Sequence, residues 1–188
     1  MKTLVVYAHP THESHAQHTL KLVEENLKNK KIHYEVLDLY KMKFDPVLSY
    51  DELYEAKTKG VPKEIKHIQD KITESEHLIF IYPIWWSGMP AILKGFIDRV
   101  FSAGYAFKYT NGVPKGLLHG KKATVFVSTG ANKWVTGIFL GNRFKKNVAK
   151  DILGFCGIKA KVYHTDKARA LDDIQKEKIR RNVEDALG

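Results

Sequence analysis

The sequence is poor in cysteine: Cys156 is the only one among 188 residues, so no internal disulfide can form. A chain of this kind suits a reducing compartment, and we expect a cytoplasmic location. No apolar run approaches the ~20 residues that a membrane-spanning helix needs. The short apolar run near the N-terminus leads into no small-residue cleavage site, so it predicts a buried strand rather than a signal peptide. We therefore expect no membrane insertion.

Long blocks of positive charge are also missing. The formal net charge is +10, which favours anionic partners in general, from acidic membrane surfaces to phosphate-bearing cofactors. The lysines are scattered, however, and many alternate with acidic residues. The pattern therefore predicts a well-solvated basic surface and no nucleic-acid binding.

Two phosphate-binding motifs are absent. The chain contains neither GxGxxG nor GxxxxGK[ST], which excludes the fingerprint of Rossmann dehydrogenases and the P-loop. If the protein binds phosphate, hydroxyl, imidazole and backbone donors must hold it.

What the chain does contain is an alternation of short apolar runs and longer amphipathic stretches. The runs predict strands over 4–7, 32–39, 77–82, 123–127 and 159–164. The stretches predict helices over 15–29, around 65–72, over 91–101, within 137–153 and over 171–187, with a loop over 102–119. Apolar strands that alternate with amphipathic helices indicate an α/β fold, a doubly wound five-stranded parallel sheet with helices on both faces. The length suits one domain over 1–188. Such sheets bind ligands at the carboxyl ends of their strands, so the loops after the first, third and fourth strands are the candidate site.

The first loop leads into a predicted helix with Ser14 as its N-cap. A helix N-terminus attracts phosphate, and nearby imidazoles add donors. A simple capped turn remains an alternative. The histidines at 9, 12, 15 and 18 also raise the possibility of zinc, but no cysteine, acidic ligand or HExxH order accompanies them, and we expect no metal.

The second and third loops carry different chemistry. Trp85 and Trp86 follow the third strand, where paired aromatics can form a flat apolar wall for a planar ligand, and Gly88 and Pro90 shape the turn so that backbone N–H groups face the pocket. Small and hydroxyl residues follow the fourth strand, over 128–132, and let a ligand approach the backbone closely. Core packing for the tryptophans and a plain turn for the third loop are the alternatives.

Together these segments resemble a known family. The stretch over 83–101, PIWWSGMPAILKGFIDRVF, is similar to the P-L-x-W-x-x-x-P-A-x-L-K-G-x-x-D-R-V-F signature of flavodoxin-like NAD(P)H quinone reductases. His9-Pro10 with Ser14 resembles that family's H-P-x-x-x-S-x-x-N phosphate loop, and residues 129–131 lie where the family has T-G-G. The resemblance covers about residues 2–187 and implies a flavodoxin-like form of the predicted sheet.

The resemblance implies a flavoprotein. Enzymes of the family transfer a hydride from NAD(P)H to the flavin N5 atom and then to a quinone or similar acceptor, in a ping-pong reaction. The short chain favours FMN, with FAD as the alternative. The family also implies a homodimer whose sites are completed by the partner chain. A second function is an ancillary subunit that docks on a potassium-efflux transporter, since residues 14–16 are similar to those proteins.

The family's cofactor contacts carry over to the three loops of this chain. The expected contacts are His9, Ser14, His15 and Gln17 at the phosphate end of the flavin; Pro83, Ile84, Trp85, Trp86 and Ser87 along the isoalloxazine edge, with backbone donors; and Thr129, Gly130, Ala131 and Asn132 on the other side of the ring.

Three positions depart from the family pattern. Gln17 replaces the usual asparagine, and Trp85 stands where many members have glutamine. Some members place a tyrosine and a histidine after the T-G-G loop, but residues 129–160 contain neither. We therefore assign no acid–base residue from the sequence.

Overall fold

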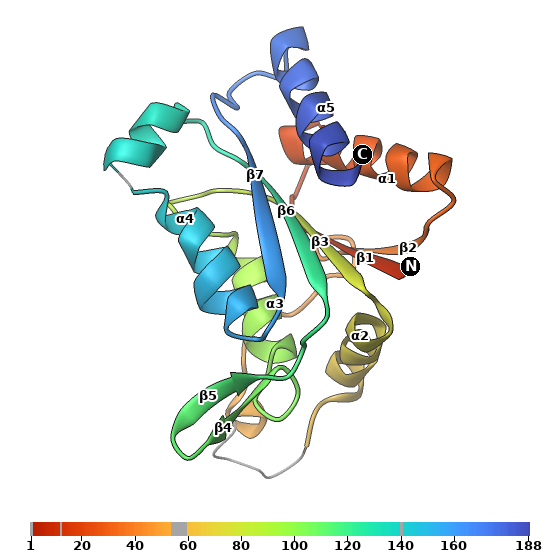
Figure 1. Ribbon diagram of the computed structural model, residues 1–188, viewed down its shortest axis with the longest axis vertical. Helices are drawn as coiled ribbons and strands as arrows, with labels where there is room; N and C mark the ends of the chain where they lie inside the picture. Colours follow the sequence, from red (N-terminus) through yellow and green to blue (C-terminus); the bar gives the residue numbers. More distant parts are fainter. Residues whose placement is uncertain (1, 12, 54–59, 140) are drawn as a thin grey trace.

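The computed structural model describes residues 2–11, 13–53, 60–139 and 141–188. Its main sheet has five parallel strands in the order β2-β1-β3-β6-β7 (Figure 1). These are β1 (Lys2–Tyr7), β2 (His33–Asp38), β3 (His77–Pro83), β6 (Lys122–Ser128) and β7 (Lys159–Thr165). The strand order reverses between β1 and β3, as in doubly wound flavodoxin-like sheets. The predicted fold class is confirmed.

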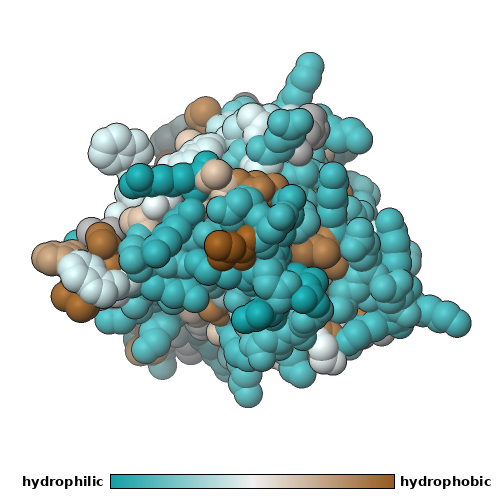
Figure 2. Space-filling view, turned by 90° about the horizontal axis from the view of Figure 1, so that it is seen from above, coloured by the Kyte–Doolittle hydropathy of each residue, from teal (hydrophilic) through white to brown (hydrophobic). Residues whose placement is uncertain are grey.

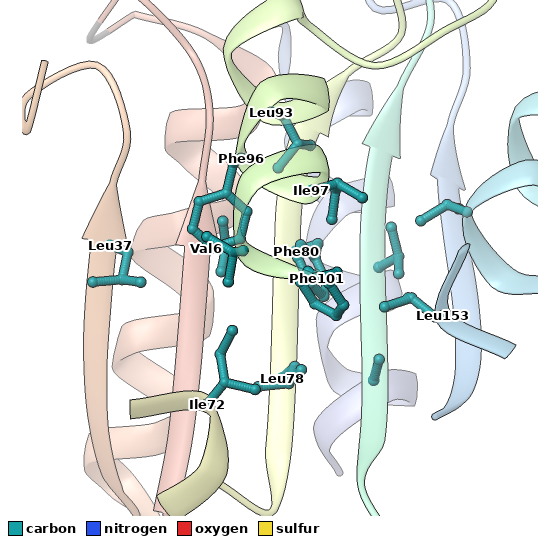
Figure 3. Close-up of a cluster of buried hydrophobic side chains, with 14 of the residues drawn as sticks. Val6, Leu37, Ile72, Leu78, Phe80, Leu93, Phe96, Ile97, Phe101 and Leu153 are labelled. Carbon is teal, nitrogen blue, oxygen red and sulfur yellow. The ribbon is translucent and has the colours of Figure 1, made fainter. Parts of the chain in front are cut away.

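Helices cover both faces of this sheet (Figure 1). Helices α1 (His15–Asn29) and α5 (Asp173–Leu187) contact each other on one face, while α2 (Lys63–Glu74) and α3 (Ala91–Val100) lie on the other. Successive side chains of a strand point to opposite faces, so β1 contributes Val5 and Tyr7 to one buried core and Leu4 and Val6 to the other. Figure 3 shows Phe96 and Phe101 at α3 packed toward the β-sheet in the second of these cores.

The segment over 102–119 is more ordered than the sequence analysis predicts. It contains an antiparallel hairpin of β4 (Phe107–Thr110) and β5 (Val113–Gly116). Asn111 and Gly112 form its turn, with φ angles of 53° and 77°. Asn-Gly favours this left-handed two-residue turn, whose twist matches that of the strands it joins. The prediction of a plain loop was therefore wrong.

The helix predicted within 137–153 is broken into pieces. The structure has η2 (Val135–Phe139), α4 (Arg143–Lys146) and η3 (Asn147–Gly154), where η2 and η3 are π-helical. Gly141 and Asn142 both have left-handed backbone angles, with φ of 57° and 50°, and these angles end the helical path between the first two pieces.

A buried arginine fixes the segment between β2 and α2. The Arg99 guanidinium in α3 donates to Glu52 and Glu64 carboxylates, both at 2.8 Å, and to the Asp45 carbonyl at 2.7 Å. Glu52 belongs to the short helix η1 (Tyr50–Glu52), so Arg99 ties η1 and α2 to α3. Among the described residues, no helix is long and apolar enough to cross a membrane.

Candidate flavin site

A cavity of about 250 Å³ lies at the carboxyl ends of the strands. Figure 2 looks onto this end of the molecule, which is mostly hydrophilic with apolar groups at its left edge. The cavity is lined by His9, Glu13, Ser14, His15, Pro83, Ile84, Trp85, Ser128, Gly130, Ala168 and Arg169. Its lining includes residues at the ends of β1, β3 and β6. The strand order reverses between β1 and β3, and doubly wound sheets bind ligands at this point. Seven of the predicted contacts meet there.

The first loop presents a helix N-terminus to this cavity. Ser14 is the N-cap of α1, and its hydroxyl accepts from the Gln17 backbone N–H at 3.1 Å. The first turn of α1 contains no acidic residue, so the dipole at this end of the helix is not neutralised from within the turn. The arrangement favours an anion. Gln17 itself lines a neighbouring cavity of about 370 Å³, together with Ser14 and Lys21.

The histidines of this region are neutral donors rather than cations. Burial lowers the pKa of His9, His15 and His18 below the ordinary imidazole value. The His15 side chain is buried, and its Nε2 atom has no hydrogen-bond partner among the described residues. His12 lies outside the described residues, and within them no group of three or more histidine, cysteine or acidic side chains is placed to hold a metal.

The second loop is a tight left-handed turn. The backbone N–H of Gly88 donates to the Trp85 carbonyl at 2.9 Å, and Trp86 and Ser87 between them have φ angles of 51° and 61°. A tryptophan with such an angle is strained, and strain of this kind gathers at functional sites. The tip of this turn carries the Trp86 side chain into solvent, where it is fully exposed.

The two tryptophans therefore do not form one wall in the single chain. Trp85 lines the cavity, with its ring 6.1 Å from that of His9, whereas Trp86 projects away from it. For two residues of this loop, the backbone N–H groups are not available to the pocket. The N–H groups of Ile84 and Trp85 donate instead to the Ser128 and Gly88 carbonyls, at 2.8 and 2.9 Å.

The third loop divides its residues between two environments. Thr129 is buried, and its hydroxyl donates to the Ala131 carbonyl at 2.9 Å and lies 2.7 Å from His164 Nε2. Gly130 lines the flavin cavity, and a methyl group added there would meet no atom within 4 Å. Ala131 and Asn132 line a neighbouring cavity of about 510 Å³. Thr129 thus shapes the loop from beneath, while the next three residues face the ligand space.

The loop after β7 supplies residues that the sequence analysis missed. Ala168 and Arg169 line the flavin cavity, and the Ala168 N–H donates to the Thr129 carbonyl at 2.8 Å. The available signal was the end of the fifth strand itself, because every strand of a parallel sheet ends at the same edge. Arg169 adds a cation close to the anion-binding end of α1.

These residues fit a phosphate-bearing flavin. A helix N-terminus and an unpartnered buried imidazole nitrogen offer donors to a phosphate. Trp85 and Ile84 offer an apolar edge, and Gly130 leaves open space for a planar ring. The site therefore has one anion-binding end and one aromatic end, as a phosphate-bearing flavin requires.

Comparisons with known proteins agree with this fold. The model of a family described as having a flavodoxin-like fold matches residues 1–187. An NAD(P)H oxidoreductase of Haemophilus influenzae is 37% identical over 133 residues, which are 70% of this chain and 66% of that protein. The mouse ribosyldihydronicotinamide dehydrogenase [quinone] is 34% identical over 181 residues, covering 84% of this chain and 78% of that protein.

A solved structure extends the comparison. The NAD(P)H:quinone oxidoreductase of Methanothermobacter marburgensis superposes with a TM-score of 0.86 at 29% identity, covering 98% of this chain and 94% of that one. The sheet order and the strand-end cavity define a flavodoxin-like α/β protein. The chain belongs to the flavodoxin-like family of NAD(P)H oxidoreductases and quinone dehydrogenases.

Proposed function

We propose that the chain is a flavin-dependent enzyme that transfers two electrons, as a hydride, from NAD(P)H to a quinone or similar acceptor. The observation that carries this proposal is the cavity at the β1–β3 reversal, which joins a helix N-terminus to an aromatic edge. The names of the similar proteins, an NAD(P)H oxidoreductase and two quinone-reducing enzymes, support the same reaction class.

In this proposal, the chain binds FMN through its strand-end loops. Ser14 and the first turn of α1 hold the phosphate, with His9 and His15 as further donors. Gln17 supports the phosphate end from the next cavity. FMN supplies hydride acceptance and donation at its N5 atom, in two half-reactions that use one ring face in turn.

The protein's own contribution is placement. Ile84 and Trp85 form one wall of the space for the flavin ring. Gly130 has no side chain, so it leaves room for the ring on the opposite side of that space. Hydrogen bonds from Ile84 to Ser128 and from Ala168 to Thr129 fix the loops after β3, β6 and β7 against one another. A cradle fixed in this way lowers the entropic cost of bringing donor and acceptor to the same atom.

We also propose a cytoplasmic homodimer. The hairpin of β4 and β5 carries two largely exposed apolar side chains, Tyr109 and Val113. Beside it lies a cavity of about 320 Å³ whose lining includes Phe101, Phe107 and Phe155. This apolar surface is available to a second copy, which would complete the ring face that Trp86 leaves uncovered in the single chain.

The test is to purify the protein and extract its chromophore. We expect a yellow protein that releases FMN and oxidises NADH or NADPH with a small quinone as acceptor. Ser14→Ala should bind FMN more weakly than Ser87→Ala, because only Ser14 caps the helix at the phosphate end. A colourless protein that takes up neither FMN nor FAD would refute the proposal.

A further inference from the structure

A second cavity of about 510 Å³ adjoins the flavin cavity. Its lining consists of Gly130, Ala131, Asn132, Val135, Lys167 and Arg169. Gly130 and Arg169 also line the flavin cavity, so the two spaces are neighbours that share a wall. A molecule whose reactive end lies over the flavin ring can therefore extend into this second cavity.

The walls of the second cavity are fixed by backbone hydrogen bonds. The Lys167 N–H donates to the Ala131 carbonyl at 3.2 Å, and the Ala168 N–H donates to the Thr129 carbonyl at 2.8 Å. Lys167 has a φ of 56°, in the left-handed region that lysine rarely adopts. The Arg169 N–H then donates to the Lys167 carbonyl at 2.8 Å. This strained turn carries Lys167 and Arg169 at its two ends, and both residues line the second cavity.

The charge of this cavity is unbalanced. Lys167 and Arg169 are exposed, and neither forms an ion pair with any described residue. The lining contains no acidic side chain. The nearest acid in sequence, Asp166, is already engaged by Lys178 at 3.0 Å and by the Lys133 N–H at 3.1 Å. In contrast, the lining of the cavity beside Gln17 contains an acidic residue, Glu13, as well as its cation, Lys21.

Two unpaired cations with a shared cavity favour an anionic group with several oxygens, and phosphate monoesters fit this description. The electron donor of the proposed reaction carries such a group only in its phosphorylated form, because NADPH has a 2′-phosphate that NADH lacks. We propose that Lys167 and Arg169 bind the 2′-phosphate of NADPH, so that the enzyme prefers NADPH to NADH. This inference rests on the proposed function for its donor, and it adds the donor's identity.

Calorimetry with nucleotide fragments tests the cavity without any turnover. The probes are adenosine 2′,5′-bisphosphate and 5′-AMP, which differ only in the 2′-phosphate, added to the flavin-loaded protein. We expect the bisphosphate to bind at least tenfold more tightly. Lys167→Gln should weaken bisphosphate binding about fivefold more than 5′-AMP binding, the loss of one exposed charge-assisted contact. Lys41→Gln and Arg143→Gln are the matched controls, since both residues are exposed cations outside the cavity.

Kinetics give the second readout. The ratio of kcat/KM for NADPH to that for NADH should fall about fivefold in Lys167→Gln and about twentyfold in Lys167→Gln/Arg169→Gln, and it should not change in the two controls. Added salt should reduce the wild-type ratio, because the contacts are exposed.

Each result separates the two proposals. Equal binding of the two fragments to the wild-type protein, or an unchanged ratio in the double variant, would overturn the assignment. Loss of bound flavin from Lys167→Gln, with the nucleotide preference retained, would also overturn it, because the cavity would then hold the phosphates of FAD. Preferential bisphosphate binding without any NADPH oxidation would keep the cavity assignment and refute the oxidoreductase.

Discussion

His164 Nε2 and the Thr129 hydroxyl oxygen lie 2.7 Å apart beneath the third loop. Because the hydroxyl donates to the Ala131 carbonyl, the imidazole must be the donor in this pair. The Phe144 ring packs against the same imidazole at 5.2 Å between centroids, and its Nδ1 atom has no partner among the described residues. His164 is therefore a neutral, buried support of the loop.

This support makes stability depend on pH. Burial, helped by the positive charges of Lys145 and Lys133, lowers the pKa of His164 to about 4 from the ordinary imidazole value of 6.5. Protonation thus favours the unfolded chain, so the stabilising share of His164 is complete above pH 6.5 and is lost as the pH falls toward 4. We expect this share to be about 3 kcal/mol. Urea unfolding at several pH values measures it.

The matched variants for this test are His164→Gln, which keeps an N–H donor for Thr129, and the exposed His33→Gln. The slope of unfolding free energy between pH 6.5 and 4 should flatten in the first variant and remain in the second. Identical slopes in the wild type and His164→Gln would contradict the assignment.

The tryptophans differ in their expected effect on flavin binding. Trp85→Ala should weaken FMN binding three- to tenfold, because it removes about 1 kcal/mol of aromatic contact from the cavity. Trp134→Ala should change it little, since Trp134 lies outside that lining. Titration of the apoprotein with FMN, followed by flavin fluorescence, gives both affinities. An equal loss in the two variants would remove Trp85 from the site.

The left-handed turn at Trp86 predicts a trade between stability and binding. Trp86→Asn should raise the free energy of unfolding by about 1 kcal/mol, because asparagine adopts positive φ angles at lower cost. If Trp86 contacts the flavin in the dimer, the same variant should bind FMN more weakly. Denaturant midpoints and FMN titration measure the two effects. A less stable variant would show that the exposed ring stabilises the chain by other means.

The buried ion pair of Arg99 and Glu52 predicts sensitivity to acid. Burial acts to raise the pKa of Glu52, but hydrogen bonds from Arg99 and Ser49 outweigh it and hold that pKa below the ordinary value. The pair therefore stabilises the fold above the ordinary glutamate pKa, and its contribution is lost as the pH falls below it. Glu52→Gln should reduce the slope of unfolding free energy against pH in this acidic range.

Replacing Arg99 should lower the free energy of unfolding more than replacing its acidic partner Glu52. Arg99→Met should destabilise the chain by about 3 kcal/mol, because it leaves Glu52 buried without a counter-charge. The double variant Arg99→Met/Glu52→Gln should recover part of this loss. If the double variant is as unstable as Arg99→Met, then Arg99 acts through its contacts with Phe44 and the Asp45 carbonyl instead.

The central strands β1, β3 and β6 were predictable because they are largely continuous apolar runs, which a strand buried on both faces requires. The outer strands β2 and β7 contain charged residues and were predicted from their shorter apolar segments. The hairpin of β4 and β5 was missed although Asn111-Gly112 is a hairpin signal and Phe107–Thr110 alternates, because each strand has only four residues and the second, Val113–Gly116, contains a proline and no alternation. The break at Gly141-Asn142 was missed because the apolar residues continue on both sides of it.

The sequence predicted which loops form the site better than it predicted which side chains line the cavity. Ser14 caps its helix as expected, and Trp85 and Gly130 line the cavity. The inward direction of Thr129 depends on His164, which lies 35 residues further along the chain, so local sequence patterns do not reveal it. Arg169 reaches the cavity because the loop after β7 packs against the loop after β6. This is also a tertiary contact that local sequence patterns do not reveal.

The flavin cavity and the two buried cores share almost no side chains; Ile84, which packs at the margin of one core, is the exception among the cavity residues. Most side chains of the cavity can therefore be substituted without removing a side chain from either core. Loop substitutions can change the electron donor or acceptor while the sheet continues to fold as before. Such a scaffold is a favourable starting point for directed evolution of new reductases.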